Sequence, residues 1–351
     1  MSEPVPRSQP VVPTLPRHAV DATPSRRDAG PVLAVEGLRV NIAADRGLVP
    51  VLDRVSFQLH AGEMLGMVGE SGSGKSLTAL ALMGLLGPTS QLIGGRIVYE
   101  GRDHAHAGEA EWQRVRGRHV ALVFQSARRA LHPIRPVGRQ LMDVLRTHHH
   151  LTRQEAKRRA VALLAEVGIA DPQARFAALP GALSGGMCQR VMIALALAGD
   201  PAVLIADEPT SSLDAPTRTV IVDLLADLAR RRGLATLFIT HDLALAARRC
   251  DRIVVMHAGQ LVETAPAARL LTRPAHPYTV RLVRAAPALA ASLADLQAVP
   301  GVLPDLAAPD LPACRFCDRC DRALPVCRTE VPLTRTLDAA TGHRVACWAV
   351  D

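Results

Sequence analysis

Short apolar runs alternate with longer amphipathic segments along most of the chain. Five runs read as buried strands: "MLGMVG" (64–69), "HVALVFQ" (119–125), "AVLIAD" (202–207), "TLFITH" (236–241) and "DRIVVM" (251–256). Ala- and Leu-rich segments with helical spacing begin near Lys75, Ala156, Cys188, Ala215 and Leu243. Nearly continuous apolar strands followed by helices predict an α/β fold whose sheet is mixed, largely parallel and buried on both faces.

The two ends of the chain depart from this alternation. Residues 1–30 are rich in proline and have no apolar periodicity, which predicts a disordered extension. After about residue 265, a helical stretch "HPYTVRLVRAA" leads into the proline-rich "VPGVLPDLAAPDLP" and then a cysteine-rich tail. We find no internal repeat, so the pattern predicts one copy of the α/β unit over residues 31–265.

Composition narrows the class of protein. The chain is 48% hydrophobic, yet no apolar run reaches the roughly 18 residues that a membrane span needs. The N-terminus lacks the apolar core of a secretory signal, which favours a cytoplasmic protein. The formal charge of +8 would suit nucleic acid or an anionic membrane. Because the basic runs at 157–159 and 230–232 lie in helical stretches, we interpret them as solvated helix faces.

The segment "GESGSGKS" follows one predicted strand and opens the next helix. Its spacing is that of a loop whose backbone N–H groups surround phosphates, and its candidate residues are Gly69, Ser71, Gly72, Gly74, Lys75 and Ser76. In such a loop Lys75 reaches the β- and γ-phosphates, and the Ser76 hydroxyl is a ligand of Mg²⁺.

The strand "AVLIAD" ends in two adjacent carboxylates. The carboxyl ends of parallel strands are where α/β folds bind ligands. We therefore expect Asp207 to lie on the Mg²⁺ side of a nucleotide, and Glu208 to act as the general base on the attacking water.

Four further motifs complete an ordered set. "LSGGMCQR" (183–190), Gln125 in "VFQ", "SSLD" (211–214) and His241 in "ITHD" resemble the signature, Q-loop, D-loop and switch motifs of ATP-binding cassette (ABC) ATPases. The resemblance implies a P-loop ABC ATPase domain over residues 31–265, with a helical subdomain at about 126–185. It also implies that Gln125 senses Mg²⁺ and the attacking water, and that His241 contacts the γ-phosphate.

In this family two domains close head to tail around ATP. The resemblance therefore implies that the signature acts on the nucleotide of the partner ATPase, through Ser184, Gly185, Gly186, Gln189 and Asp214. Physically, a hydroxyl and free N–H groups at a helix N-terminus form a second phosphate clamp.

The segment between phosphate loop and signature is compact, and the chain holds one cassette. This favours an importer ATPase over a soluble ABC ATPase acting on DNA or ribosomes. "HPYT", "PGVLPDL" and the cysteine tail resemble the C-terminal extension (266–351) of oligopeptide/dipeptide importer ATPases. The resemblance implies two permease subunits, a second and different ATPase subunit, an extracytoplasmic binding protein acting indirectly, no nucleic acid, and a peripheral position on the cytoplasmic face of the inner membrane.

The main alternative is an importer of nickel or another small solute. "HHH" at 148–150 would suit nickel, but a surface loop or a helix end explains three adjacent histidines equally well.

Five of the seven cysteines lie between residues 314 and 347. In a reducing cytosol this concentration favours a metal site over disulfides. The resemblance implies a 4Fe–4S cluster on Cys314, Cys320, Cys327 and Cys347, with Cys317 as a spare or substitute. Tetrahedral Zn²⁺ on four thiolates fits the same spacing and stays open as an alternative.

Overall fold

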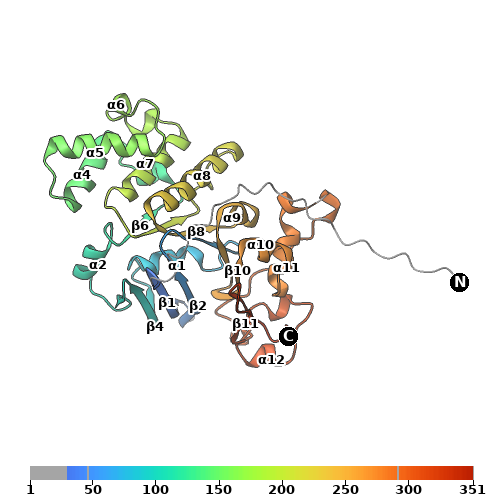
Figure 1. The fold of residues 1–351 in the computed structure, drawn as a ribbon. Helices are drawn as coiled ribbons and strands as arrows, with labels where there is room; N and C mark the ends of the chain where they lie inside the picture. The colour runs from blue at the N-terminus through green and yellow to red at the C-terminus, as the bar shows by residue number, and fades with distance from the viewer. Residues whose placement is uncertain (1–29, 46, 291, 351) are drawn as a thin grey trace.

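The computed structural model describes residues 30–45, 47–290 and 292–350. The predicted proline-rich extension, apart from Gly30, lies outside the described residues. Two sheets organise the described chain (Figure 1). The larger has the strand order β11-β12-β10-β9-β3-β8-β7-β6. Its strands are β3 (Met64–Val68), β6 (Val120–Val123), β7 (Val203–Asp207), β8 (Ala235–Thr240), β9 (Arg252–His257), β10 (Gln260–Pro266), β11 (Thr334–Asp338) and β12 (His343–Ala346).

The centre of this sheet is parallel. Strands β6, β7, β8, β3 and β9 pair in parallel in that order, and nearly all their side chains are buried. These are the five strands predicted from the apolar runs, so that prediction is confirmed. Burial on both faces explains why they are apolar at successive positions rather than at alternate ones.

Helices flank the parallel strands. They include α1 (Lys75–Leu82), α7 (Gly185–Leu197), α8 (Ala215–Arg232) and α9 (Leu243–Arg249). The starts predicted at Lys75, Ala215 and Leu243 are confirmed, whereas α5 (Arg153–Glu166) and α7 each begin three residues before the predicted position. Both early starts have a side-chain cap: Thr152 forms a capping box with Glu155, and the Ser184 hydroxyl accepts from the Met187 N–H.

The smaller sheet is antiparallel. It has the order β2-β1-β4-β5 and consists of β1 (Leu33–Ala44), β2 (Gly47–Leu59), β4 (Ser90–Tyr99) and β5 (Arg102–Asp103). Its apolar face shares one core with α1 and with strands of the larger sheet, and α2 (Glu109–Val115) contributes Trp112 to the same core. Helix α1 therefore shares one core with strands of both sheets.

A helical region lies between β6 and β7, where a subdomain was predicted. It contains α3 (Ala127–Ala130), α4 (Val137–His148), α5, α6 (Pro172–Arg175) and a 3₁₀ turn at Pro180–Ala182, and it leads into α7. Figure 1 shows it projecting to one side of the sheets. Helix α4 ends at His148, and the His149 ring contacts the carbonyl oxygen of Ala198 at 2.9 Å, so the histidine run marks a helix end.

The basic runs on α5 and α8 are only partly solvated. Arg230 pairs with Asp227 on the exposed face of its own helix. Arg232 instead joins α8 to α5 through a two-point contact with Glu166, at 2.8 and 2.5 Å. Part of the positive charge is therefore used in joining helices.

The C-terminal part of the chain extends the larger sheet. It comprises α10 (Ala267–Thr272), α11 (Pro277–Ala285), α12 (Val326–Thr329), β11, β12 and 3₁₀ turns at Pro287–Leu289, Leu293–Asp295 and Cys317–Arg319. Strand β12 pairs antiparallel with β10, with Glu263 opposite Val345. In the part of the chain that the structure describes, no helix combines the length and apolarity needed to cross a bilayer.

Candidate functional site

The phosphate loop joins β3 to α1. A Cβ at Gly69 would lie 2.1 Å from the carbonyl oxygen of Met256, so only glycine fits there. Gly74 has φ of +106° directly before α1, in the region that favours glycine. Ser71, Gly72 and Ser76 are exposed, so the loop presents its outer face to solvent.

Lys75 folds back over this loop. Its Nζ donates to the carbonyl oxygens of Gly69 and Glu70, at 2.9 and 2.7 Å, and to the Ser73 hydroxyl at 3.3 Å. Burial lowers the pKa of Lys75, and the carboxylates of Glu208, Asp207 and Glu70 oppose that shift. The ammonium is therefore already positioned where phosphate oxygens would replace loop carbonyls.

Ser76 and Asp207 meet at the end of β7. The Ser76 Oγ donates to Asp207 Oδ1 at 3.1 Å. Burial raises the pKa of Asp207, as does the neighbouring Glu208, while the Ser76 hydrogen bond and Lys75 lower it. A hydroxyl and a carboxylate at this distance are hard oxygen donors of the kind that Mg²⁺ prefers, so these residues fit the ion.

Three polar side chains converge after β6, β7 and β8. Glu208 Oε2 accepts from Gln125 Nε2, and Glu208 Oε1 lies against His241 Nδ1, both at 3.3 Å. Glu208 has φ of +44°, which is rare for a residue with a side chain. Strained backbone held at a strand end is typical of functional sites. The sequence-predicted catalytic residues are thus brought together.

The signature residues and Asp214 lie elsewhere, in or directly before α7 and α8 rather than at the start of α1 (Figure 1). Ser184 caps α7, and Ser184 and Gly185 are exposed. A Cβ at Gly186 would lie 2.9 Å from Thr217 on α8, which explains a small residue there. Asp214 is exposed just before α8, whereas the Gln189 side chain is 1% exposed, inside the domain.

Sequence reasoning missed a contact between the phosphate loop and the C-terminal part of the chain. Arg319 forms two hydrogen bonds with the Glu70 carboxylate, at 2.8 and 2.9 Å, and the Glu70 N–H donates to the Tyr278 hydroxyl at 3.0 Å. The signal was present in part, because Tyr278 belongs to the "HPYT" run and Arg319 precedes Cys320.

The five tail cysteines are neighbours. The Cys314 N–H donates to the Cys327 carbonyl oxygen at 2.9 Å. Burial, together with the nearby Cys327, Cys347 and Cys317, raises the pKa of Cys314 to about 12. Even so, within residues 30–45, 47–290 and 292–350, no group of three or more His, Cys, Asp or Glu side chains is arranged to hold a metal ion. The thiols as placed do not form a ready-made iron–sulfur or zinc site.

The phosphate loop, the converging carboxylates and the capped signature helix together define an ATP-binding cassette. A family model described as ABC transporter matches residues 52–211. A second model, described as the C-terminal region of oligopeptide/dipeptide transporters, matches residues 262–327.

Relatives and solved structures agree with this class. The chain is 41% identical over 319 residues to the probable peptide ABC transporter ATP-binding protein y4tR of Sinorhizobium fredii, which covers 90% of this chain and 94% of that protein. It is 42% identical to the probable D,D-dipeptide transport ATP-binding protein DdpD of Escherichia coli, and the match covers 91% of this chain and 96% of that protein. The dimeric post-hydrolysis structure of the cassette MJ0796 bound to ADP and Pi matches with a TM-score of 0.60 and 26% identity, over 67% of this chain and 98% of that one.

The chain therefore belongs to the ABC transporter family, as an ATP-binding subunit that hydrolyses ATP. The expected ABC fold is confirmed.

Proposed function

We propose that this chain powers the uptake of di- or oligopeptides through a membrane ABC importer. The observation that carries the cargo class is the C-terminal region, which matches that of oligopeptide/dipeptide transporters and is continuous with the ATPase sheet. Relatives named for peptide and dipeptide transport, at 40–42% identity, support the same cargo.

Within the ATP site we assign roles from the contacts. The phosphate loop, with Lys75, holds the nucleotide phosphates, and Ser76 and Asp207 hold Mg²⁺, with Gln125 near the ion and the attacking water. Glu208 takes the proton of the attacking water. His241, whose Nδ1 lies against Oε1 of Glu208, contacts the γ-phosphate. Mg²⁺, when bound, neutralises the charge that develops on the phosphates.

The signature acts on the nucleotide of a partner ATPase. This proposal rests on the position of Ser184, Gly185, Gly186 and Asp214 at the N-terminal ends of α7 and α8 rather than at the start of α1. The matched MJ0796 cassette was solved as a dimer. We further propose that the partner is a different ATPase subunit.

We expect the isolated chain to hydrolyse ATP poorly. The physical reason is that each site lacks its second phosphate clamp until two cassettes close. The measurement is steady-state hydrolysis by the purified chain, alone and in complex with the permeases and the second ATPase. Full activity from a strictly monomeric chain would contradict the proposal.

We place the chain on the cytoplasmic face of the inner membrane, bound to two permease subunits and acting with an extracytoplasmic binding protein. The large apolar side chains Phe124, Ile134 and Leu179 are 45%, 79% and 42% exposed. Phe124 directly precedes Gln125, and Ile134 and Leu179 lie in connections between the helices that follow β6. Contact of a permease with these side chains would couple cargo transport to the catalytic residues through Gln125.

Cargo is tested by deletion and complementation. Deleting the gene should abolish growth on di- or oligopeptides as the nitrogen source, and restoring the intact gene, but not Lys75→Ala, should recover it. Unchanged peptide uptake together with loss of radiolabelled nickel uptake would instead support the nickel alternative.

We also propose that Cys314, Cys320, Cys327 and Cys347 bind a metal. Their mutual electrostatic contacts support this, and five arginines near them in sequence would balance four thiolates: Arg315, Arg319, Arg322, Arg328 and Arg344. Because the side chains as placed are not a ready-made metal site, binding would have to draw the thiols together. A 4Fe–4S cluster is the first candidate and Zn²⁺ the alternative.

Anaerobic purification followed by metal analysis tests this. A brown protein absorbing near ~400 nm is expected for a thiolate-bound cluster. Stoichiometric zinc in a colourless protein would favour Zn²⁺, and absence of both metals would refute the proposal. Loss of metal in Cys317→Ser but not in Cys327→Ser would overturn the choice of ligands.

A further inference from the structure

The cysteine-rich segment reaches the phosphate loop through one arginine. Arg319 lies in the turn Cys317–Arg319 and donates through both Nη atoms to the Glu70 carboxylate. Its side chain is 5% exposed and that of Glu70 is 29% exposed, so the pair is largely shielded from water. A two-point contact between guanidinium and carboxylate is both stronger and more directional than a single hydrogen bond.

The surroundings of Arg319 fix its position. Its Nε donates to the Pro300 carbonyl oxygen at 2.6 Å, and its guanidinium lies 5.7 Å from the Phe316 ring centre. One Nη lies 3.0 Å from His257 Nε2. Burial, together with Arg319 and Arg315, lowers the pKa of His257 to about 3, so this ring is neutral and accepts the hydrogen bond. Arg319 therefore has little freedom to leave Glu70.

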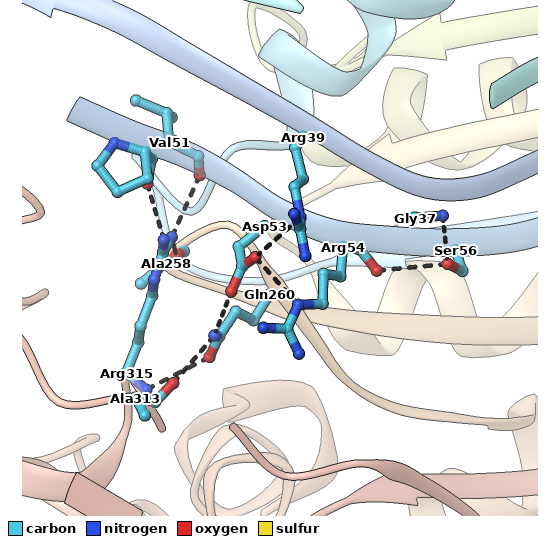
Figure 2. A network of polar contacts seen from close by, with 11 residues as sticks. Gly37, Arg39, Val51, Asp53, Arg54, Ser56, Ala258, Gln260, Ala313 and Arg315 are labelled. Atoms are coloured by element: carbon cyan, nitrogen blue, oxygen red, sulfur yellow. Dashed lines mark hydrogen bonds and ion pairs between the residues drawn. The ribbon is translucent and has the colours of Figure 1, made fainter. Parts of the chain in front are cut away.

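A second arginine of the cysteine-rich segment, Arg315, is connected to the phosphate loop through the residues that follow β9. Figure 2 shows Arg315 directed at the main-chain oxygens of Val51 and Ala258. In the same figure Gln260 bridges Asp53 and Ala313. The next residue after Ala258 completes the connection, because the Gly259 N–H donates to the carbonyl oxygen of Ser73, inside the phosphate loop, at 2.7 Å.

Glu70 places an acidic side chain in a loop that binds phosphates. Its carboxylate would repel the negative charges of ATP, and the repulsion is stronger where water is partly excluded. Arg319 cancels this charge and fixes the carboxylate at a set place. The Tyr278 hydroxyl accepts the Glu70 N–H, which fixes the backbone at the same residue.

We propose that Arg319 is a positioning residue for ATP binding, which neutralises Glu70 and holds the phosphate loop in its binding shape. The C-terminal segment is then part of the nucleotide site, although it supplies no group that touches the reacting atoms.

The test is nucleotide affinity in the full-length chain. Arg319→Gln should raise the Kd for a fluorescent ATP analogue with Mg²⁺ by about tenfold, the scale expected from losing hydrogen bonds to a charged group. In the assembled ATPase, KM for ATP should rise while kcat stays within about twofold. Arg328→Gln is the matched control, because Arg328 lies in the same segment in an exposed pair with Asp318.

Second variants separate charge from folding. Glu70→Gln in the Arg319→Gln background should recover much of the lost affinity, because no carboxylate is then left unpaired. Arg319→Lys keeps the charge but not the two-point geometry, so its affinity should be intermediate. An unchanged Kd in Arg319→Gln would overturn the proposal, as would a double variant that binds no better than Arg319→Gln despite an unchanged unfolding temperature.

Discussion

Glu208→Gln should bind ATP and Mg²⁺ normally and hydrolyse ATP at least about 10²-fold more slowly, the scale expected from losing a general base. The glutamine has nearly the same shape and can still hydrogen-bond with Gln125 and His241, each of which lies 3.3 Å from a Glu208 oxygen. What it lacks is a carboxylate to accept the proton of water. The measurement is kcat in the assembled complex, alongside the Kd for the nucleotide.

A control separates this effect from general damage. Glu111 is half-exposed on α2 and pairs with His104, so Glu111→Gln should leave kcat unchanged. Near-normal hydrolysis by Glu208→Gln would remove Glu208 from the role of base. A parallel loss of nucleotide binding would show instead that its part is in holding the site together.

The parallel centre of the fold could be predicted because its signal is local. Strands β6, β7, β8, β3 and β9 are each a nearly continuous apolar run, because a strand buried on both faces needs apolar side chains at successive positions. The apolar pattern predicts starts of α5 and α7 that are three residues late, because each helix begins at a polar cap, Thr152 or Ser184, which apolar spacing does not mark. The pairing of β12 with β10 joins residues about 80 positions apart, and no local pattern specifies such a pairing.

The residues of the ATP site could be predicted from the sequence, but not all of their contacts. Residue types at motif spacing named Lys75, Asp207 and Glu208, and parallel topology explains why they meet at one edge of the sheet. The contact between Arg319 and Glu70 could not be named in the same way, because nothing in a tail arginine specifies a partner 249 residues away. The predicted metal cluster depends on thiols that only a bound metal would draw together, and the described side chains do not arrange one.

Glu263 connects the ATPase sheet to the C-terminal part of the chain. It lies on β10, its side chain is fully buried, and its carboxylate accepts three hydrogen bonds. The donors are the N–H groups of Ala275 and His276, which precede α11, and His343 Nε2 on β12, all at 2.8 Å. Removing the carboxylate leaves these three donors without their acceptor, two of them buried and the Ala275 N–H partly buried.

We therefore expect Glu263→Ala to destabilise the protein by about 3–5 kcal/mol, the scale of breaking a buried pair from one side. In a protein of 351 residues that lowers the unfolding midpoint by about 4–7 °C, because the entropy of unfolding is about 2.1 cal/mol/K per residue. The matched control is Glu330→Ala, in which an exposed carboxylate of the same C-terminal region is removed and little change is expected. Thermal unfolding followed by circular dichroism makes the comparison. If Glu263→Ala unfolds within about 2 °C of the unmodified chain, well under the loss expected from a broken buried pair, water must reach the three donors, and the C-terminal region would be joined to the sheet mainly by the pairing of β12 with β10.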